Sequence, residues 1–420
     1  MKKIFYFAAI LFVALSGACQ SEHDSNNEKG AADEPAGALP DAKPIAGHIE
    51  QKVATDNAFA LDVFKATYAN SEETNVFVSP LSISMAFSMA LNGAAGATFD
   101  EIADVLHAKS YAIDSINEHS RLLRSELTGV DPSTQLSVAN SIWYRKGFPV
   151  KNTFLEVNRT SYAAEVSALD FSLPAAVTQI NSWCAKQTND KIKSILEEIP
   201  SEAMMYLINA VYFKGIWASK FDKSSTREKS FYASDGKTNQ VQMMRQTEYF
   251  SYASDEYGQY LELPYGNKAF SMIVLLPGEN KTTEDIVERL DSDQWYRISD
   301  NMYEREVNLS LPRFKVECKY AMHKKILPAL GMSLPFTQFA DFSRISDKPL
   351  LISGVIHKTF VEVNEEGTEA AAVTSIGMDA ASAGPDEQID FVVNKPFVFV
   401  IHEKSSGVIL FIGKIGEIKG

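Results

Sequence analysis

The sequence has few cysteines, few histidines and none of the residue patterns by which enzymes are usually recognised. Its 420 residues include three cysteines and seven histidines, and no two histidines stand at metal-ligand spacing. There is no G-x-S-x-G turn, no H-E-x-x-H pair and no glycine-rich phosphate loop. One S-x-x-K match, Ser234 to Lys237, lies on a Ser-Asp-Gly turn and lacks the S-D-N and K-T-G motifs that accompany it in penicillin-recognising enzymes. The sequence therefore predicts no catalytic residue, no metal site and no cofactor.

The scarcity of cysteine also excludes a disulfide scaffold. Apart from Cys19 the chain has only Cys184 and Cys318, and their spacing matches no disulfide framework. A chain of this length can bury a core without such a cross-link. We expect both to be buried, unreactive thiols.

Positive charge is in deficit as well. The chain carries 40 Lys and Arg against 54 Asp and Glu, for a net charge of −14. This balance argues against nucleic acid or an anionic membrane surface as the main partner.

The first 19 residues have the pattern of an export signal. Two lysines precede an apolar run, Ile4 to Leu15, which is too short to span a bilayer. Small residues then lead to Cys19, so the segment resembles a bacterial lipoprotein signal, residues 1–18, with Cys19 as the lipidated mature N-terminus. The usual pattern has leucine three places before the cysteine, whereas Leu15 is four places before it. The alternative is a plain secretory signal cut near Ala18, and either signal implies export.

The next segment, residues 19–46, is polar and rich in Gly, Pro and Ala. Such a composition cannot bury enough apolar surface to offset its ordering entropy, so it predicts a flexible tether. Its early acidic residues resemble signals that send lipoproteins to the outer face of some bacteria. Residues 47–420 show no second linker and no repeat, and we expect one large domain there.

The pattern of this domain is α+β, a large mixed sheet with further sheets and helices packed over them. Helical spacing runs through residues 49–70, Ser79-Pro80 begins another helix that ends near Gly93 and Gly96, and a third covers residues 174–190. β-branched and aromatic runs predict strands, several of them apolar almost throughout, as in strands covered on both faces. These runs are residues 134–144, 205–217, 260–265, 271–277, 307–317, 358–364, 391–403 and 407–415, the last two joined by a hairpin turn.

One stretch does not fit a packed domain. It reads NEEGTEAAAVTSIGMDAASAGPDEQIDF from Asn364 to Phe391. Its side chains are too small to form a core, and the segment is too long for an ordinary turn. At strand period from Thr368 to Met378, every charge falls on one face and the other face is small or apolar. Gly367, just before it, supplies a hinge. The stretch is compatible with a sheet but is predicted to start outside it, as a switch would.

VEVNEEGTEAAAVT closely resembles the reactive-loop hinge of serpins, and most of residues 47–420 agrees. NVFVSPLSISMAFSMALNGAAGATFDEI, INSWCAKQTNDKI, LINAVYFKGIWASKFD, LPRFKVE and NKPFVFVI resemble successive segments of that family. One departure is Asp190, where the family often has Gly in a turn; we expect a local effect only. The resemblance implies a serpin fold with an exposed reactive-centre loop at about residues 365–390. The hinge that it implies comprises Glu365, Glu366, Gly367, Thr368, Glu369, Ala370, Ala371 and Ala372.

The resemblance also implies a function that is not enzymatic. In serpins a protease attacks the exposed loop, forms an acyl-enzyme, and is trapped when the cut loop inserts as a strand into the main sheet. The implied partner is therefore a target protease held covalently by a monomeric inhibitor, with no nucleic acid and with membrane attachment only through Cys19. The alternative is a serpin that does not inhibit and acts as a binding or carrier protein. Such members tend to carry charge or proline in the hinge, whereas this chain has Thr-Glu-Ala-Ala-Ala-Val. An extracellular hydrolase would need a nucleophile and base that the sequence lacks.

Loop length places the scissile bond. Counting from Thr368 by the family's usual length gives Ala381–Ser382; counting back from Asn394 gives Ser382–Ala383. Both give a small side chain at the cleavage site, and no Lys or Arg lies between Gly367 and Asn394. Elastase-like or subtilisin-like proteases, or cysteine proteases, fit better than trypsin-like ones. Met378 is a fallback site.

The resemblance further implies a polar cluster where the sheet parts and an aromatic residue where the hinge first enters. The cluster maps onto Ser79, Ser82, Asn209 and His357, and the aromatic residue onto Trp217. The alternative interpretation of these residues is ordinary core packing with satisfied polar groups.

Overall fold

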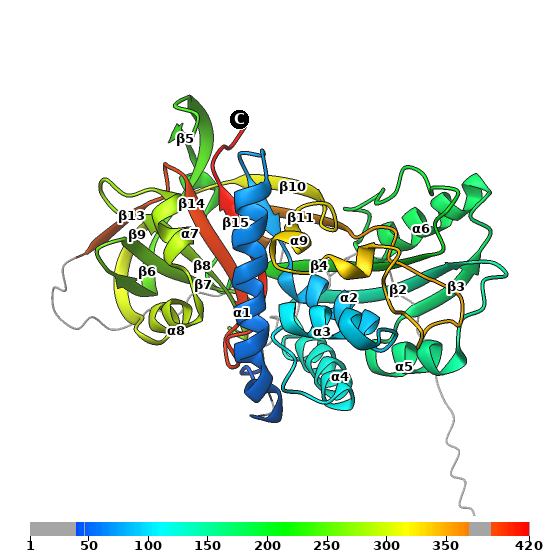
Figure 1. The fold of residues 1–420 in the computed structure, drawn as a ribbon. Helices are drawn as coiled ribbons and strands as arrows, with labels where there is room; N and C mark the ends of the chain where they lie inside the picture. Colours follow the sequence, from blue (N-terminus) through cyan, green and yellow to red (C-terminus); the bar gives the residue numbers. More distant parts are fainter. Residues whose placement is uncertain (1–38, 46, 369–387, 420) are drawn as a thin grey trace, which may run out of the picture. The chain divides into compact units, whose positions relative to one another are not determined.

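Two β-sheets form the frame of the protein (Figure 1). The computed structural model describes residues 39–45, 47–368 and 388–419. The larger sheet has nine strands in the order β1-β15-β14-β8-β7-β6-β9-β13, with β5 paired to β6. Its strands are β1 Val76–Val78, β5 Arg227–Tyr232, β6 Thr238–Ser254, β7 Gly258–Pro264, β8 Phe270–Pro277, β9 Tyr303–Pro312, β13 Ile389–Val392, β14 Phe397–Glu403 and β15 Ile409–Ile415. Among its described strands, β13 and β9 alone pair in parallel, so the sheet is mixed.

The second sheet has six strands in the order β10-β11-β12-β4-β2-β3. They are β10 Phe314–Ala321, β11 Ile356–Asn364, β12 Gly367–Thr368, β4 Met205–Ile216, β2 Gln135–Arg145 and β3 Glu165–Leu169. In the described part of the chain, β12 is the only strand between β11 and β4, and it has two residues.

The described helices are α1 Gly47–Asn70, α2 Pro80–Leu91, α3 Gly96–Val105, α4 Ile113–Gly129, α5 Asn152–Tyr162, α6 Pro174–Gln187, α7 Thr283–Arg289, α8 Ser292–Asp300 and α9 Ile326–Ala329, with 3₁₀ turns at Lys223–Ser225 and Leu334–Phe336. Helix α2 is buried almost throughout and packs on β4 and β15. Helix α6 packs on β2 and β4, where Ile180 and Cys184 share a cluster with Trp143 and Ile208. Since β4 is covered on both faces, its near-continuous apolar sequence is explained, as predicted.

The predicted strands agree with the structure except at two points. The run at residues 307–317 was predicted as one strand, but it divides at Arg313 into β9 of the nine-stranded sheet and β10 of the six-stranded sheet. The run at residues 391–403 divides into β13 and β14 around Asn394-Lys395-Pro396, where proline has no N–H for a ladder. The first division has a consequence for function, because it leaves Arg313 between the two sheets.

Three smaller expectations can be compared with the structure. Cys184 and Cys318 are both free and buried, as predicted, and burial raises the pKa of the Cys184 thiol to about 12. Asp190 adopts a φ of 60°, the left-handed conformation that favours Gly but that Asp tolerates. Within the described residues, no helix has the length and apolar character needed to cross a membrane.

Candidate functional site

The predicted hinge begins inside the six-stranded sheet. Thr368 pairs with Val363 on β11 and with Gly215 on β4, while Gly367 pairs with Asn364 and Ile216. Glu365 and Thr368 are 2% and 1% exposed. The expectation that the exposed loop begins near residue 365 is therefore wrong for residues 365–368, which are held in or against the sheet.

Glycine is required at position 367 by the close approach of β4. Its φ of 144° is a conformation that other residues rarely adopt, and a Cβ there would lie 2.1 Å from the carbonyl oxygen of Gly215. It would also lie 2.7 Å from the Cα of Ile216. Gly367 therefore does more than provide flexibility: it lets the hinge backbone enter beside β4.

Thr368 turns its side chain into the core. Its hydroxyl lies 2.7 Å from the hydroxyl of Tyr265, which is fully buried. Burial raises the pKa of Tyr265, so its hydroxyl stays protonated and available for this bond. Tyr265 in turn stacks on Trp217, with ring centroids 4.4 Å apart. The inward face of the predicted strand thus begins with an uncharged side chain whose hydroxyl is hydrogen-bonded.

Trp217 holds the backbone just before β12. Its indole Nε1–H donates to the carbonyl of Asn364 at 2.9 Å, and its backbone N–H donates to the carbonyl of Glu366 at 2.9 Å. The backbone N–H of Phe221 donates to the carbonyl of Glu365 at 3.0 Å. The aromatic residue predicted at the entry of the hinge therefore lies against the hinge, at the end of β4.

Two ion-paired glutamates complete this attachment, which we term the hinge latch: Glu365 and Glu366 with Arg313, Thr226, Lys220 and Lys223. The Nε of Arg313 lies 2.9 and 2.8 Å from the two carboxylate oxygens of Glu365, and Thr226 donates its hydroxyl to the same carboxylate. Burial alone would raise the pKa of Glu365, but these hydrogen bonds more than offset it and the pKa is lowered.

The second glutamate, Glu366, is bound by two lysines. Its carboxylate lies 2.8 Å from the Nζ of Lys223 and 2.9 Å from the Nζ of Lys220. Hydrogen bonds from both ammonium groups lower the pKa of Glu366. Both carboxylates of the latch are thus held in the charged form.

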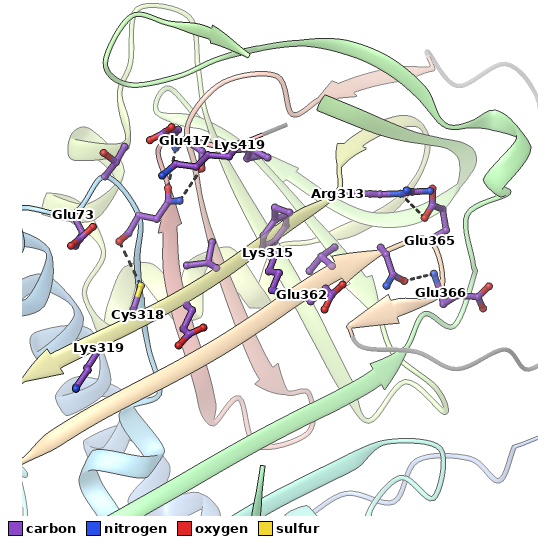
Figure 2. Close-up of a pocket in the computed structure, with 18 of the residues that line it drawn as sticks. Glu73, Arg313, Lys315, Cys318, Lys319, Glu362, Glu365, Glu366, Glu417 and Lys419 are labelled. Atoms are coloured by element: carbon purple, nitrogen blue, oxygen red, sulfur yellow. Dashed lines mark hydrogen bonds and ion pairs between the residues drawn. The ribbon is translucent and has the colours of Figure 1, made fainter. Parts of the chain in front are cut away.

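The latch borders a groove of about 1060 Å³ along β10 (Figure 2). Figure 2 shows Arg313, Glu365 and Glu366 at one end of the groove and Glu417 and Lys419 near the other. The side chain of Arg313 is 43% exposed while that of Glu365 is 2% exposed. Salt and small ions therefore reach the cation of this pair but not its anion.

A second set of polar contacts joins β4 and β11 through the start of α2. The backbone N–H of Ser79 donates to the Nε2 of His357 on β11 at 3.0 Å, and the Ser79 hydroxyl donates to the carbonyl of Leu410 at 2.9 Å. The hydroxyl of Ser82 donates to the side-chain carbonyl of Asn209 on β4. The structure thus brings the four predicted residues together as two pairs on one helix end.

Several contributors were missed by the sequence analysis. Asn140 on β2 accepts from Asn209 at 2.5 Å and donates to the carbonyl of Tyr162 at 2.9 Å, extending the polar contacts across the sheet. Its position among alternating residues of the predicted strand 134–144 could have revealed it. No pattern in the sequence indicates Tyr265, Thr226, Lys220 or Lys223, because they contact the hinge only through tertiary folding.

His357 is neutral in the folded protein. It is 4% exposed, and burial lowers its pKa to about 3. Only a neutral imidazole has a ring nitrogen free to accept from the Ser79 N–H. The contact between α2 and β11 therefore requires that the Nε2 of His357 carries no proton.

The remaining predicted site residues lie outside the described part of the chain. They are Cys19, Glu369, Ala370, Ala371, Ala372, Met378, Ala381, Ser382 and Ala383. Within the described part, no group of His, Cys, Asp and Glu is arranged to hold a metal ion.

Comparisons with known proteins relate the chain to one family. A family profile described as Serpin (serine protease inhibitor) matches residues 54–418. Human Serpin B3 is 37% identical, covering 86% of this chain and 97% of that protein, and Iris of Ixodes ricinus is 36% identical over the same shares. The native-state crystal structure of the thermophilic serpin tengpin is similar at a TM-score of 0.81 and 31% identity, covering 92% of this chain and 98% of that one. Human thyroxine-binding globulin in complex with thyroxine is similar at 0.81 and 27%, covering 89% and 100%.

The close approach at Gly367 generates a first prediction. Gly367→Ala should expel β12, because its Cβ would overlap the backbone of β4. Hydrogen exchange of the peptides that contain β4 residues 212–216 and β11 residues 361–364 should rise several-fold. Gly129→Ala, whose Cβ would meet nothing within 4 Å, is the matched control. Unchanged exchange in Gly367→Ala would show that this glycine is not needed for the pairing.

The neutral His357 generates a second prediction. In the unfolded chain a histidine takes up a proton below about pH 6.5, whereas folded His357 does so only below about pH 3. Between these values the unfolded state binds more protons, so His357 should lower the free energy of unfolding as pH falls, by up to about 1.4 kcal/mol per pH unit. Denaturant unfolding from pH 7 to pH 4 should show a smaller loss for His357→Gln than for the wild type. Parallel curves would contradict the prediction.

Proposed function

Because the chain belongs to the serpin family, we propose that it is a suicide inhibitor of proteases. Serpins are generally protease inhibitors rather than enzymes. The finer proposal is that a protease cleaves the loop after Thr368 and forms an acyl-enzyme. The cut loop then enters the six-stranded sheet before hydrolysis and distorts the attached protease. The observation that carries this proposal is β12, the start of the same segment already paired on both edges.

The register of β12 supports insertion of the whole predicted strand. Continued one residue at a time, the pairing with β4 would carry the segment from Thr368 opposite Gly215 to Met378 opposite Met205, the first residue of β4. The segment that the sequence marks as fit for a sheet therefore has the length of the strand beside it. It contains no proline and no charge on its inward face.

The same register connects insertion to the polar contacts under the sheet. Thr374 would fall opposite Asn209 on β4 and opposite His357 on β11. These two residues are held by Ser82 and Ser79 at the start of α2. An inserting strand would thus bring an uncharged hydroxyl between them, where it can exchange hydrogen bonds with the cluster. We assign Ser79, Ser82, Asn209 and His357 the role of a contact that opens and closes again around the strand.

The proposed targets follow from the loop sequence. Cleavage at Ala381–Ser382 or Ser382–Ala383 would present a small side chain, which suits elastase-like or subtilisin-like serine proteases and some cysteine proteases. Cleavage at Met378 would shorten the inserted strand and favour release of the protease. We place the protein, as an exported monomer, on the bacterial cell envelope through a lipid at Cys19, or in the medium if the signal is cut near Ala18.

A second function has one observation in its favour. The likeness to thyroxine-binding globulin, which binds thyroxine, indicates that a non-inhibitory binding or carrier role is compatible with this fold. Incubation with pancreatic elastase and subtilisin, then denaturing electrophoresis and mass spectrometry of the released peptide, separates the two. A complex that survives denaturation supports inhibition, and the first residue of the peptide identifies the scissile bond. Loop cleavage without a complex across a wide protease panel would favour the carrier role.

The burial of Thr368 gives a third prediction. Thr368→Arg would place a charge beside Tyr265 without a partner, a change that costs several kcal/mol and should displace β12, the strand that the inserting loop extends. The stoichiometry of inhibition should rise at least about tenfold as the variant is cleaved without trapping. Thr368→Ser, which keeps the hydroxyl, is the control and should inhibit normally. Equal stoichiometry in the arginine variant would contradict the requirement for an uncharged, buried residue 368 when the rest of the loop inserts.

A further inference from the structure

A cavity lined by three arginines lies between helix α8 and the strands β6, β7 and β9, and we term it the arginine cavity. Its volume is about 540 Å³, within the range of small-molecule sites. The guanidinium groups belong to Arg289, Arg297 and Arg305, and Asp255 is the one carboxylate in the described lining. The whole chain carries a net charge of −14, so this local excess of cations runs against its overall balance. The excess indicates a site for an anion.

One face of α8 forms a wall of the arginine cavity. Gln294, Arg297 and Asn301 follow one another at spacings of three and four residues, so their side chains share a side of the helix. Asn301 caps the helix, and its side-chain amide donates to the carbonyl of Arg297 at 2.6 Å. The guanidinium of Arg297 forms neither an ion pair nor a hydrogen bond with any residue that the structure describes. It therefore lines the cavity with an uncompensated positive charge.

Strand β9 supplies the opposite wall. Tyr303 and Arg305 lie on the same face as the buried Val307, because alternate residues of a strand share a face. Tyr303 pairs with Tyr252 on β6, so two phenol rings adjoin Arg305 on this wall. The ring of Tyr303 is 62% exposed and can pack against another molecule. Nη1 of Arg305 donates to the carbonyl of Glu304 at 2.9 Å, and its guanidinium has no carboxylate partner among the described residues.

The third guanidinium, that of Arg289 at the end of α7, is held in place but lacks a hydrogen-bond partner. Its Cζ lies 3.9 Å from the centroid of the Tyr257 ring, a cation–π contact that fixes its plane. Its Nη1 is buried and donates to no atom of the described chain, because the carboxylates of Asp255 and Glu256 are 3.6 and 3.9 Å away. A buried N–H without a partner is rare in native structures, and an oxygen of a ligand would supply the missing acceptor.

The one carboxylate of the lining is already engaged. Oδ1 of Asp255 accepts from the backbone N–H groups of Tyr257 and Gly258 at 2.8 and 3.2 Å and from the hydroxyl of Tyr260 at 2.8 Å. These bonds orient the carboxylate toward the turn between β6 and β7. Its charge is thus stabilised by that turn, and the charges of Arg297 and Arg305 remain for an incoming anion.

We propose that the arginine cavity binds a phosphate monoester of a small aromatic molecule. A phosphate monoester carries a charge of about −1.5 to −2 at pH 7 and three strong acceptor oxygens. The planar fork of a guanidinium matches such a group with two parallel hydrogen bonds. The ring of the ligand packs on Tyr303, since aromatic pairs gain energy beyond the area that they bury. This site is separate from the hinge and does not depend on the inhibitory function proposed above.

Isothermal titration calorimetry of the full chain in phosphate-free buffer at low salt tests the site, with phenyl phosphate and inorganic phosphate as probes. Phenyl phosphate should bind once per chain, and inorganic phosphate should bind about fivefold more weakly because it lacks the ring. Arg297→Gln with Arg305→Gln should weaken phenyl phosphate at least about tenfold through the loss of charge-assisted hydrogen bonds. Tyr303→Ser should reduce the affinity for phenyl phosphate to that for inorganic phosphate. Melting temperatures check that each variant folds.

A matched control makes the same charge change elsewhere on the surface. Arg159→Gln with Lys229→Gln alters exposed residues of α5 and β5 and should keep the wild-type affinity for phenyl phosphate. Equal weakening in the control and in the cavity variant would show that net charge alone attracts the probe, and would overturn the site. Absence of phenyl phosphate binding would overturn it as well. Equal affinities of the wild type for the two probes would overturn the assignment of an aromatic ester.

Discussion

The structure depends on the pairing of two residues, Gly367 and Thr368, between β11 and β4. At this end the short strand β12 joins β11 and β4, and farther along the sheet each of them is hydrogen-bonded to the start of α2, at His357 and at Asn209. The pairing is possible because Gly367 has no Cβ, which would otherwise overlap the backbone of β4. It also fixes the register in which any further residues of the loop can follow. A cut loop would therefore find its alignment already set.

The contacts around this pairing can be broken and formed again at modest cost in free energy. The hinge latch is made of charged pairs whose cation side is open to solvent, so its net contribution is modest and sensitive to salt. The contacts under the sheet are hydrogen bonds between neutral groups, which can be exchanged for those of an entering strand without leaving a buried charge. Both sets of contacts keep β11 and β4 together without large apolar side chains packed between these strands. Such an arrangement suits a protein whose sheet must open once.

Much of the fold could be predicted from the sequence, and the reasons are local. Continuous apolar runs at residues 205–217 and 271–277 mark strands covered on both faces, and Ser79-Pro80 marks the start of α2. The exceptions are also informative. The strands around Arg313 and around Pro396 were predicted as single runs because an apolar pattern alone does not show where a chain changes its strand neighbours. At Arg313 the chain passes from the nine-stranded to the six-stranded sheet, and around Pro396 it moves from one edge of the nine-stranded sheet to its interior.

The site was less predictable for a similar reason. The hinge stands out by its small residues and its faces, but its partial insertion depends on Tyr265 and on the cations of the latch, which are distant in sequence. Arg313 lies in the strand predicted at residues 307–317, yet nothing in that segment indicates that Glu365 is its partner. Long-range ion pairs carry no local signal. The resemblance to serpins identified the region, and the structure was needed to show that residues 365–368 are already engaged.

The central claim is that the segment after Thr368 can complete the six-stranded sheet, and thermal unfolding of uncleaved and loop-cleaved protein tests it most directly. Ladder hydrogen bonds for roughly ten further residues, at about 1 kcal/mol each, should raise the melting temperature by at least about 10 °C. The account predicts this rise after a single cut in the loop, with the C-terminal fragment still held in the nine-stranded sheet through β13, β14 and β15. An unchanged or lower melting temperature in the cleaved protein would contradict it.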